Sequence, residues 1–123
     1  MKFAEENDNS SYTITAYDSD YIAINGKNFH QSLVLSPQKF IPDWTPQSYS
    51  LLEDSHLNEF YELNAEIILL GTGEKQIFPN KEILRRLAKE QIGFEIMDTH
   101  AACRTFNILM AEGRNVVAGL FLK

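Results

Sequence analysis

Residues 67–73, IILLGTG, open the segment that decides the fold; it continues with KEILRRLAKEQIGFEIM at residues 81–97 and DTHAACRTFNILMAEG at residues 98–113. The run at 66–70 is apolar without alternation, which predicts a strand buried on both faces. Residues 94–97 and 115–122 predict two further strands, and helices are expected over 81–91 and 99–112. This alternation of strands and helices predicts parallel pairing, with the helices packed over the sheet.

The expected ends of these elements carry their own signals. Asn80 is a predicted cap for the first helix, and Asp98 or Thr99 for the second. Glycines at 93 and 113 are expected to end the two helices. The glycine turn at 71–73 is expected to end the first strand sharply.

The first third of the chain predicts antiparallel structure. Alternation puts Tyr12, Ile14 and Ala16 on one side of a half-buried strand. Asn-Gly at 25–26, between apolar runs, predicts a hairpin, and residues 32–35 predict another strand. The prolines at 37, 42 and 46 argue against regular structure as far as about residue 47, and 53–63 holds a short helix. The predicted fold is α/β: a single three-layer domain over residues 11–123, with a central mixed sheet, helices packed on it and an additional N-terminal β-hairpin layer, after a flexible N-terminus at 1–10.

Composition excludes several classes of protein. The chain has 123 residues, 44% hydrophobic and 23% charged, which is typical of a soluble globular protein. Its net charge of -6 argues against nucleic-acid binding, which needs a basic patch. No apolar run approaches the roughly 20 residues that cross a bilayer, so we expect no membrane insertion. A single cysteine and the absence of a targeting signature in MKFAEENDNSS favour a cytoplasmic protein.

Three blocks of the sequence resemble a known family. The GTG at 71–73, the FP at 78–79 and MDTHAACRTFN at 97–107 are similar to a small α/β family of undefined biochemistry. That family includes the mitochondrial NADH dehydrogenase (complex I) assembly factor 3 and an adipogenesis-associated protein, with bacterial and archaeal relatives. The resemblance covers residues 11–122. It implies a three-layer domain with a central mixed sheet, no established catalytic activity, and a role in assembly through protein contacts.

The second helix carries a candidate reactive group. Ala102, Phe106, Leu109 and Met110 form its predicted core stripe, and Cys103 lies at the border of that stripe. His100, Arg104 and Asn107 form the adjacent polar stripe. The helix N-terminus and Arg104 would lower the pKa of the thiol, which would suit a nucleophile. A cysteine at the edge of a core stripe is more often a small apolar filler, however, and three residues on one rigid helix do not readily surround a substrate.

The sheet edge is the other candidate site. The carboxyl ends of parallel neighbours meet at one edge, where open α/β sheets bind ligands. This edge lacks the third glycine of a dinucleotide fingerprint and the Lys-Ser/Thr of a phosphate loop, so nucleotide binding is not expected. A plain strand-ending turn, and an Arg104 that pairs with a carboxylate, are the simpler interpretations. The candidate ligand- or partner-binding residues are Gly71, Thr72, Gly73, Asp98, Thr99, Cys103, Arg104 and Asn107.

The histidines and Trp44 give weaker functional signals. The three histidines lack metal-ligand spacing, so no metal or cofactor is predicted. Trp44, between two prolines, is either an exposed anchor for a partner or, as we favour, a cover for the hairpin layer.

Two hypotheses follow. The first is a non-catalytic interaction or assembly-factor-like module that binds another protein through the sheet edge or the Trp44 loop. The second is a small enzyme or ligand-binding protein with a polar pocket around Asp98, Cys103, Arg104 and Asn107.

Overall fold

The computed structural model describes residues 11–122, so the predicted flexibility of residues 1–10 lies outside the described part. Its strands are β1 (Ile14–Tyr17), β2 (Ile22–Ile24), β3 (Lys27–Phe29), β4 (Leu33–Leu35), β5 (Phe40–Ile41), β6 (Ile67–Thr72), β7 (Gly93–Met97) and β8 (Val116–Phe121). Its helical segments are η1 (Tyr49–Leu51), η2 (Asp54–Leu57), α2 (Asn58–Glu62), α3 (Lys81–Lys89) and α4 (Thr99–Ala111). The predicted order of strands and helices in the second half is confirmed.

The central sheet is mixed, as predicted. Its order is β5-β4-β8-β6-β7, with β6 parallel to both β7 and β8. β4 pairs antiparallel with β8 and with β5. The three parallel strands therefore place their carboxyl ends side by side, at one edge of the sheet.

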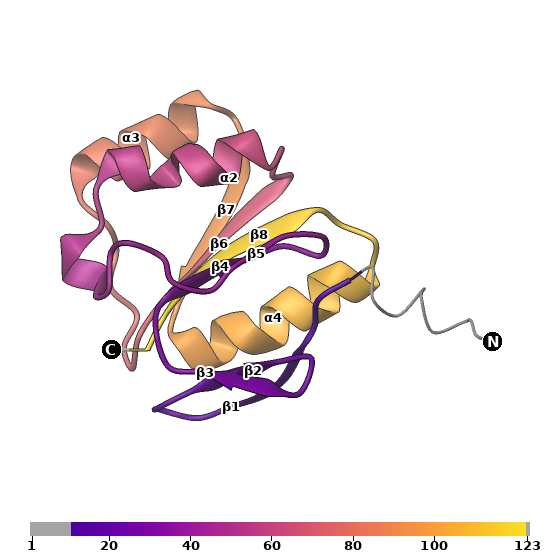
Figure 1. Cartoon of the computed structure of the whole chain (residues 1–123). Coiled ribbons are helices and arrows are strands. Elements are labelled where there is room, and N and C mark those ends of the chain that lie inside the picture. The colour runs from indigo at the N-terminus through magenta and orange to yellow at the C-terminus, as the bar shows by residue number, and fades with distance from the viewer. Residues whose placement is uncertain (1–10, 123) are drawn as a thin grey trace.

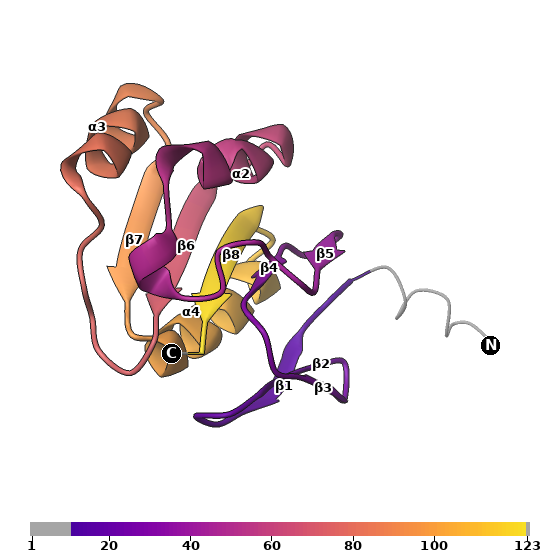
Figure 2. The same ribbon diagram turned by 60° about the vertical axis from the view of Figure 1, so that its left-hand side comes forward.

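Helices cover both faces of this sheet (Figures 1 and 2). α2 and α3 lie on one face and α4 on the other, with the three-stranded sheet β1-β2-β3 beyond α4. Successive residues of β6 serve the two faces in turn: Ile68 and Leu70 belong to the core under α3, and Leu69 to the core under α4. This division explains why the strand reads as a continuous apolar run.

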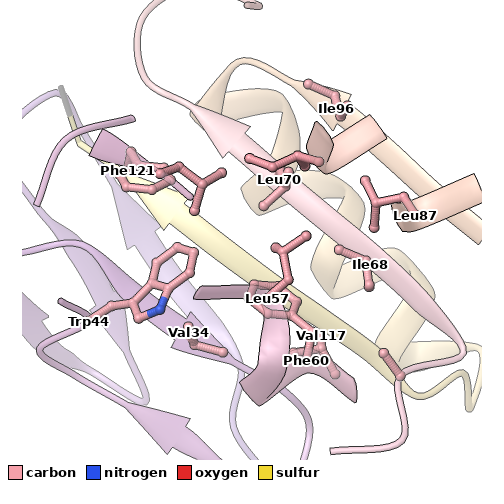
Figure 3. Packing of buried hydrophobic residues seen from close by; sticks show 13 residues of the cluster. Val34, Trp44, Leu57, Phe60, Ile68, Leu70, Leu87, Ile96, Val117 and Phe121 are labelled. Atoms are coloured by element: carbon pink, nitrogen blue, oxygen red, sulfur yellow. The ribbon is translucent and has the colours of Figure 1, made fainter. Parts of the chain in front are cut away.

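Trp44 belongs to the first of these cores (Figure 3). Its side chain is only 1% exposed, and its ring centroid lies 5.5 Å from that of Phe60 and 5.1 Å from that of Phe121. The indole Nε1 donates a hydrogen bond to Glu59 Oε1 at 3.1 Å. Both predictions for Trp44 are therefore wrong. The ring is not an exposed anchor, because it fills space over β8, and it does not cover the hairpin layer, because β1-β2-β3 lies on the other face of the central sheet, beyond α4.

The N-terminal hairpin forms where the sequence predicted it. Asn25 and Gly26 take φ values of 50° and 86°, the left-handed geometry of a two-residue hairpin turn. The predicted alternation in the first strand fails after Ile14, because the β1–β2 register shifts between Ile14 and Ala16. This bulge leaves Ala16 exposed and lets Tyr17 pack on the core in its place.

Two predicted boundaries also change, and one short strand forms where none was predicted. β6 continues through Gly71 and Thr72, because both residues still pair with β8. Gly93 does not end α3 but begins β7; Gln91, at φ 58°, supplies the left-handed turn instead. The short strand β5 was not predicted, since two residues between prolines give no periodicity.

Candidate functional site

The carboxyl edge of the sheet brings part of the predicted site together. The loop after β6 and the start of α4 are joined by reciprocal hydrogen bonds between Gly73 and Thr99. The Gly73 amide donates to Thr99 Oγ1 at 2.8 Å, and the Thr99 amide donates to the Gly73 carbonyl at 2.9 Å. Thr99 Oγ1 also donates to the Phe121 carbonyl at 2.5 Å. Since the Gly73 amide already has a partner within the fold, it does not present a free donor to a phosphate.

Gly71 is required at this edge by close packing. A Cβ at this position would lie 3.0 Å from the Thr99 Cα and 3.0 Å from the Leu120 Cδ2. Any side chain would therefore push α4 away from the strand. Only Gly73 takes a left-handed conformation, at φ 102°. The two glycines of the GTG block thus serve different needs, one in packing and one in the turn.

A small cavity of about 120 Å³ lies beside Gly73, Asp98 and Thr99. Its remaining lining residues are Asp18, Ser19, Glu74, His100 and Leu122. One carboxylate oxygen of Asp98 accepts the Ala101 amide at 2.9 Å, which confirms the predicted helix cap. Three carboxylates around so small a space disfavour an anionic ligand.

Cys103 lies outside this cavity and is fully buried. Its exposed fraction is 0%, and it packs in the core between the central sheet and α4. Burial raises the pKa of the Cys103 thiol to about 12, with Arg104 opposing the shift only in part. The nucleophile hypothesis required the opposite shift, because the thiolate is the reactive form. The packing interpretation of Cys103 is the one that the structure supports.

We expect Cys103 in the folded protein to resist alkylation at pH 8, and to react at the rate of a free thiol after denaturation. The physical reason is that the sulfur is both inaccessible and protonated at that pH. The measurement is the rate of iodoacetamide modification with and without urea. Rapid modification of the folded chain would restore the enzyme hypothesis.

Arg104 and Asn107, the other members of the predicted polar stripe, serve the N-terminal sheet. Arg104 is exposed, and its guanidinium donates to the Tyr17 hydroxyl at 3.5 Å, a contact that raises the pKa of Arg104. Asn107 Oδ1 accepts the Ile14 amide at 3.1 Å, and its Nδ2 donates to the Ile14 carbonyl at 2.7 Å. These four residues do not line one pocket: Asp98 lines the small cavity, Cys103 is buried in the core, and Arg104 and Asn107 contact β1.

A larger cavity, about 410 Å³, lies on the α3 side of the same edge. Thr72 lines it from the end of β6, so the predicted edge reaches this cavity through one residue. The segment around η1 contributes Ser48, Tyr49, Ser50 and Leu52. The loop before α3 and the helix itself contribute Ile77, Phe78, Pro79, Asn80 and Ile83. None of these side chains is charged, and most are apolar, so the cavity suits an apolar group.

Two of the lining residues, Ile77 and Phe78, are exposed apolar side chains, and exposed Leu51 lies between the lining residues Ser50 and Leu52 in the sequence; we call Leu51, Ile77 and Phe78 the apolar rim. Their exposed fractions are 60%, 51% and 66%. The loop that carries two of them is fixed to the sheet. The Thr72 hydroxyl accepts the Ile77 amide at 3.2 Å, and Gln76 Nε2 donates to the Ile96 carbonyl at 2.8 Å. The rim is therefore an apolar surface that is held in place by the sheet, and an exposed apolar patch beside a cavity is often an interaction site.

Sequence reasoning missed this site, although its signal was present. The FP block at 78–79 was noted only as part of a family resemblance. Two large apolar residues directly before a proline, in a loop with no periodicity, either cover a core or lie exposed at an interaction site. The pair is therefore a weak signal, and the exposure of both side chains in the fold decides for a surface role.

Comparison with known proteins places the chain in a family. A family described as "Protein of unknown function (DUF498/DUF598)" matches residues 14–121. The chain belongs to this family. The DUF498/DUF598 match spans every strand and helix of the fold, so both the edge cavity and the apolar rim lie within the family domain.

Named relatives of this DUF498/DUF598 protein include an assembly factor. NADH dehydrogenase [ubiquinone] 1 alpha subcomplex assembly factor 3 from Bos taurus is 32% identical over 109 residues, covering 87% of this chain and 59% of the relative. A Francisella tularensis protein named "13 kDa major membrane protein" is 45% identical over 65 residues, 53% of each chain. The chain thus spans between about half and three-fifths of these relatives.

Solved structures confirm the fold of the family. The crystal structure of a Bordetella parapertussis protein superposes with a TM-score of 0.84 at 38% identity, covering 91% of this chain and 96% of that one. The predicted α/β class and the predicted family resemblance are therefore both confirmed.

Two features are absent from the described part of this DUF498/DUF598 protein, a helix that could cross a membrane and a cluster of metal ligands. None of the helices within residues 11–122 has the length and apolar character to cross a bilayer. In the same residues, no three His, Cys, Asp or Glu side chains are grouped so that they could bind a metal ion.

Proposed function

We propose that this chain is a non-catalytic protein-interaction module that binds another protein at the apolar rim and the cavity beside it. The observation that carries the proposal is the exposure of Leu51, Ile77 and Phe78 around an apolar cavity of about 410 Å³. Exposed large apolar groups beside a concave surface are what partner sites present. The site lies at the carboxyl edge of β6 and includes Thr72 from the predicted set.

The rigidity of the rim supports this proposal. Because Thr72 and Gln76 hold the loop by hydrogen bonds, Ile77 and Phe78 are positioned before any partner arrives. Binding then costs little loop ordering, which improves affinity for a given contact area.

The alternative of a small enzyme has less support. Its candidate nucleophile, Cys103, is buried with a raised pKa, and Asn107 is engaged with the backbone of Ile14. The acidic cavity next to Asp98 holds at most a very small ligand.

The relatives support a role in assembly. The bovine relative is named as an assembly factor for NADH dehydrogenase, and we extend that kind of role to this chain: it holds a subunit of a multi-protein complex, such as a respiratory complex, during assembly. We place this activity in the cytoplasm, an environment consistent with a single, unoxidised cysteine.

The test compares partner capture by three versions of the chain in cells of its own source. We expect Phe78→Ser to reduce co-purification of the partner about tenfold, since an anchor residue at an interface carries much of the binding energy. Ile108→Ser is the matched control, because Ile108 is similarly exposed, at 58%, but lies on α4, across the central sheet from the rim. The readout is the amount of each captured protein relative to the unaltered chain.

Equal capture by all three versions would reject the rim as the partner site. Loss in both variants would also reject it, because the effect would then not depend on position. Thermal denaturation of each variant confirms that the exposed substitutions leave the fold intact.

A further inference from the structure

We infer that the occupant of the cavity beside the apolar rim is a short segment of another polypeptide that inserts apolar side chains. This inference rests on the proposed function and adds to it the chemical class of the partner. It excludes three other occupants: a second copy of this chain, a fatty acyl chain and a polar small molecule. The area, the chemistry and the shape of the site each favour the peptide.

The area of the rim is too small for a stable dimer. Three exposed side chains form an apolar patch on the order of a few hundred Å², which is the size found on ordinary monomers. A stable interface between folded proteins buries about 800 Å² on each partner. A patch of this size can still bind a short segment firmly when a cavity receives its side chains.

Several polar groups at the cavity are paired within the chain, whereas the hydroxyl of the lining residue Tyr49 is buried without a hydrogen-bond partner. The Ser48 and Ser50 hydroxyls lie 2.9 Å apart and bond each other. Asn80 Oδ1 accepts the Ile83 amide at 3.0 Å as the cap of α3. Apart from the Tyr49 hydroxyl, few donors or acceptors remain for a sugar or a nucleotide, so a mainly apolar group suits the cavity best.

A fatty acid fits less well, because its carboxylate needs a cation. None of the ten residues that line the cavity is lysine, arginine or histidine. A peptide carries no charge at the point of insertion, so the uncharged lining costs it nothing.

The position of the rim also favours an extended peptide segment over a compact ligand. The cavity is lined by residues of η1 and of the loop before α3, and each of these segments carries an exposed apolar residue, Leu51 and Phe78. A compact ligand would fill the cavity and leave the rim exposed. An extended segment covers both, with one or two side chains inside and its neighbours on the rim.

The experiment selects peptides from a display library of short random sequences against the full chain. We expect the selected peptides to share two or three large apolar residues and to bind Phe78→Ser or Leu51→Ser about tenfold more weakly. Binding to Ile108→Ser is expected to be unchanged. Amide chemical shifts of Ser50 and Phe78 in the unaltered chain should move on addition of a selected peptide.

Other outcomes would overturn the inference. Selection that yields no peptide dependent on Phe78 would do so, as would shifts at Ser50 and Phe78 caused by dodecanoate but by no peptide. Self-association that protects the rim, measured by sedimentation, would assign it to a second copy. If Phe78→Ser abolishes partner capture while no peptide binds, the proposed function stands and the partner recognises the rim as a folded surface.

Discussion

Replacement of Gly119 by alanine is expected to lower the free energy of unfolding by about 3 kcal/mol, at the upper end of the cost of overpacking a core. A Cβ at this position would lie 2.7 Å from Phe60 Cζ and 2.7 Å from Trp44 Cζ3. Both rings are at most 1% exposed, so neither can move into solvent. The strand itself cannot retreat, because β8 is paired on one side with β4 and on the other with β6.

The measurement is urea denaturation followed by the fluorescence of Trp44, the only tryptophan. Gly93→Ala is the matched control on another strand of the same sheet. Its new Cβ would lie 3.7 Å from the nearest atom, Ile67 Cγ1, and the residue is exposed. We expect the control to change stability by less than about 0.5 kcal/mol. A similar small effect for Gly119→Ala would mean that the two rings are less tightly packed against β8 than described.

Gly119 also illustrates how much of the fold was open to prediction. The run at 115–122 predicts a final strand and the order of elements predicts parallel pairing in the sheet; in the structure β8 pairs in parallel with β6. Nothing in the run indicates that Trp44, from a loop between prolines, packs against the one residue without a side chain. Hydrophobic periodicity is a local signal, whereas the choice of which ring covers which strand depends on residues far apart in sequence.

The failure at Ala16 has a related cause. The prediction from alternation at Tyr12, Ile14 and Ala16 holds only if each residue of the strand pairs with one residue of the neighbouring strand. The bulge after Ile14 breaks this relation, and the partner strand that creates it is not visible in the alternation itself.

Part of the candidate site was predicted correctly, because the geometry of the parallel strands determines which residues meet at the sheet edge. The other part was wrong, because it depends on which elements surround α4. Gly73, Asp98 and Thr99 meet at the edge because β6 and β7 are parallel neighbours. Cys103 and Asn107 were assigned to a border and to a polar stripe on the assumption that one face of α4 meets solvent. In the fold α4 lies between two sheets, so much of its polar stripe is an interface.

The apolar rim could not be predicted from periodicity, because exposure of Ile77 and Phe78 is a property of the folded loop. An apolar pair in a loop can equally well cover a core. Only the anchoring of the loop by Thr72 and Gln76 shows that these side chains are held outward.

Asn107 gives the second large expected effect: Asn107→Ala should lower the free energy of unfolding by about 2 kcal/mol. The carboxamide pairs with both backbone groups of Ile14, in place of the partner that a neighbouring strand would supply. Ile14 is only 5% exposed, so alanine would leave a buried N–H and a buried C=O without partners, at about 1 kcal/mol or more each. Urea denaturation measures the loss, and hydrogen exchange of the Ile14 amide locates it.

Arg104→Ala is the control that distinguishes the two Asn107–Ile14 hydrogen bonds from the other contacts of the polar stripe. Arg104 lies on the same helix and also reaches β1, but its contact with the Tyr17 hydroxyl is long, at 3.5 Å, and exposed. Its removal should cost less than about 0.5 kcal/mol and leave exchange at Ile14 unchanged. If the two variants instead lost equal stability, the N-terminal sheet would be held by the helix surface as a whole. A loss confined to Asn107→Ala would show that one carboxamide joins the N-terminal sheet to α4, and that this residue of the MDTHAACRTFN block has an architectural role.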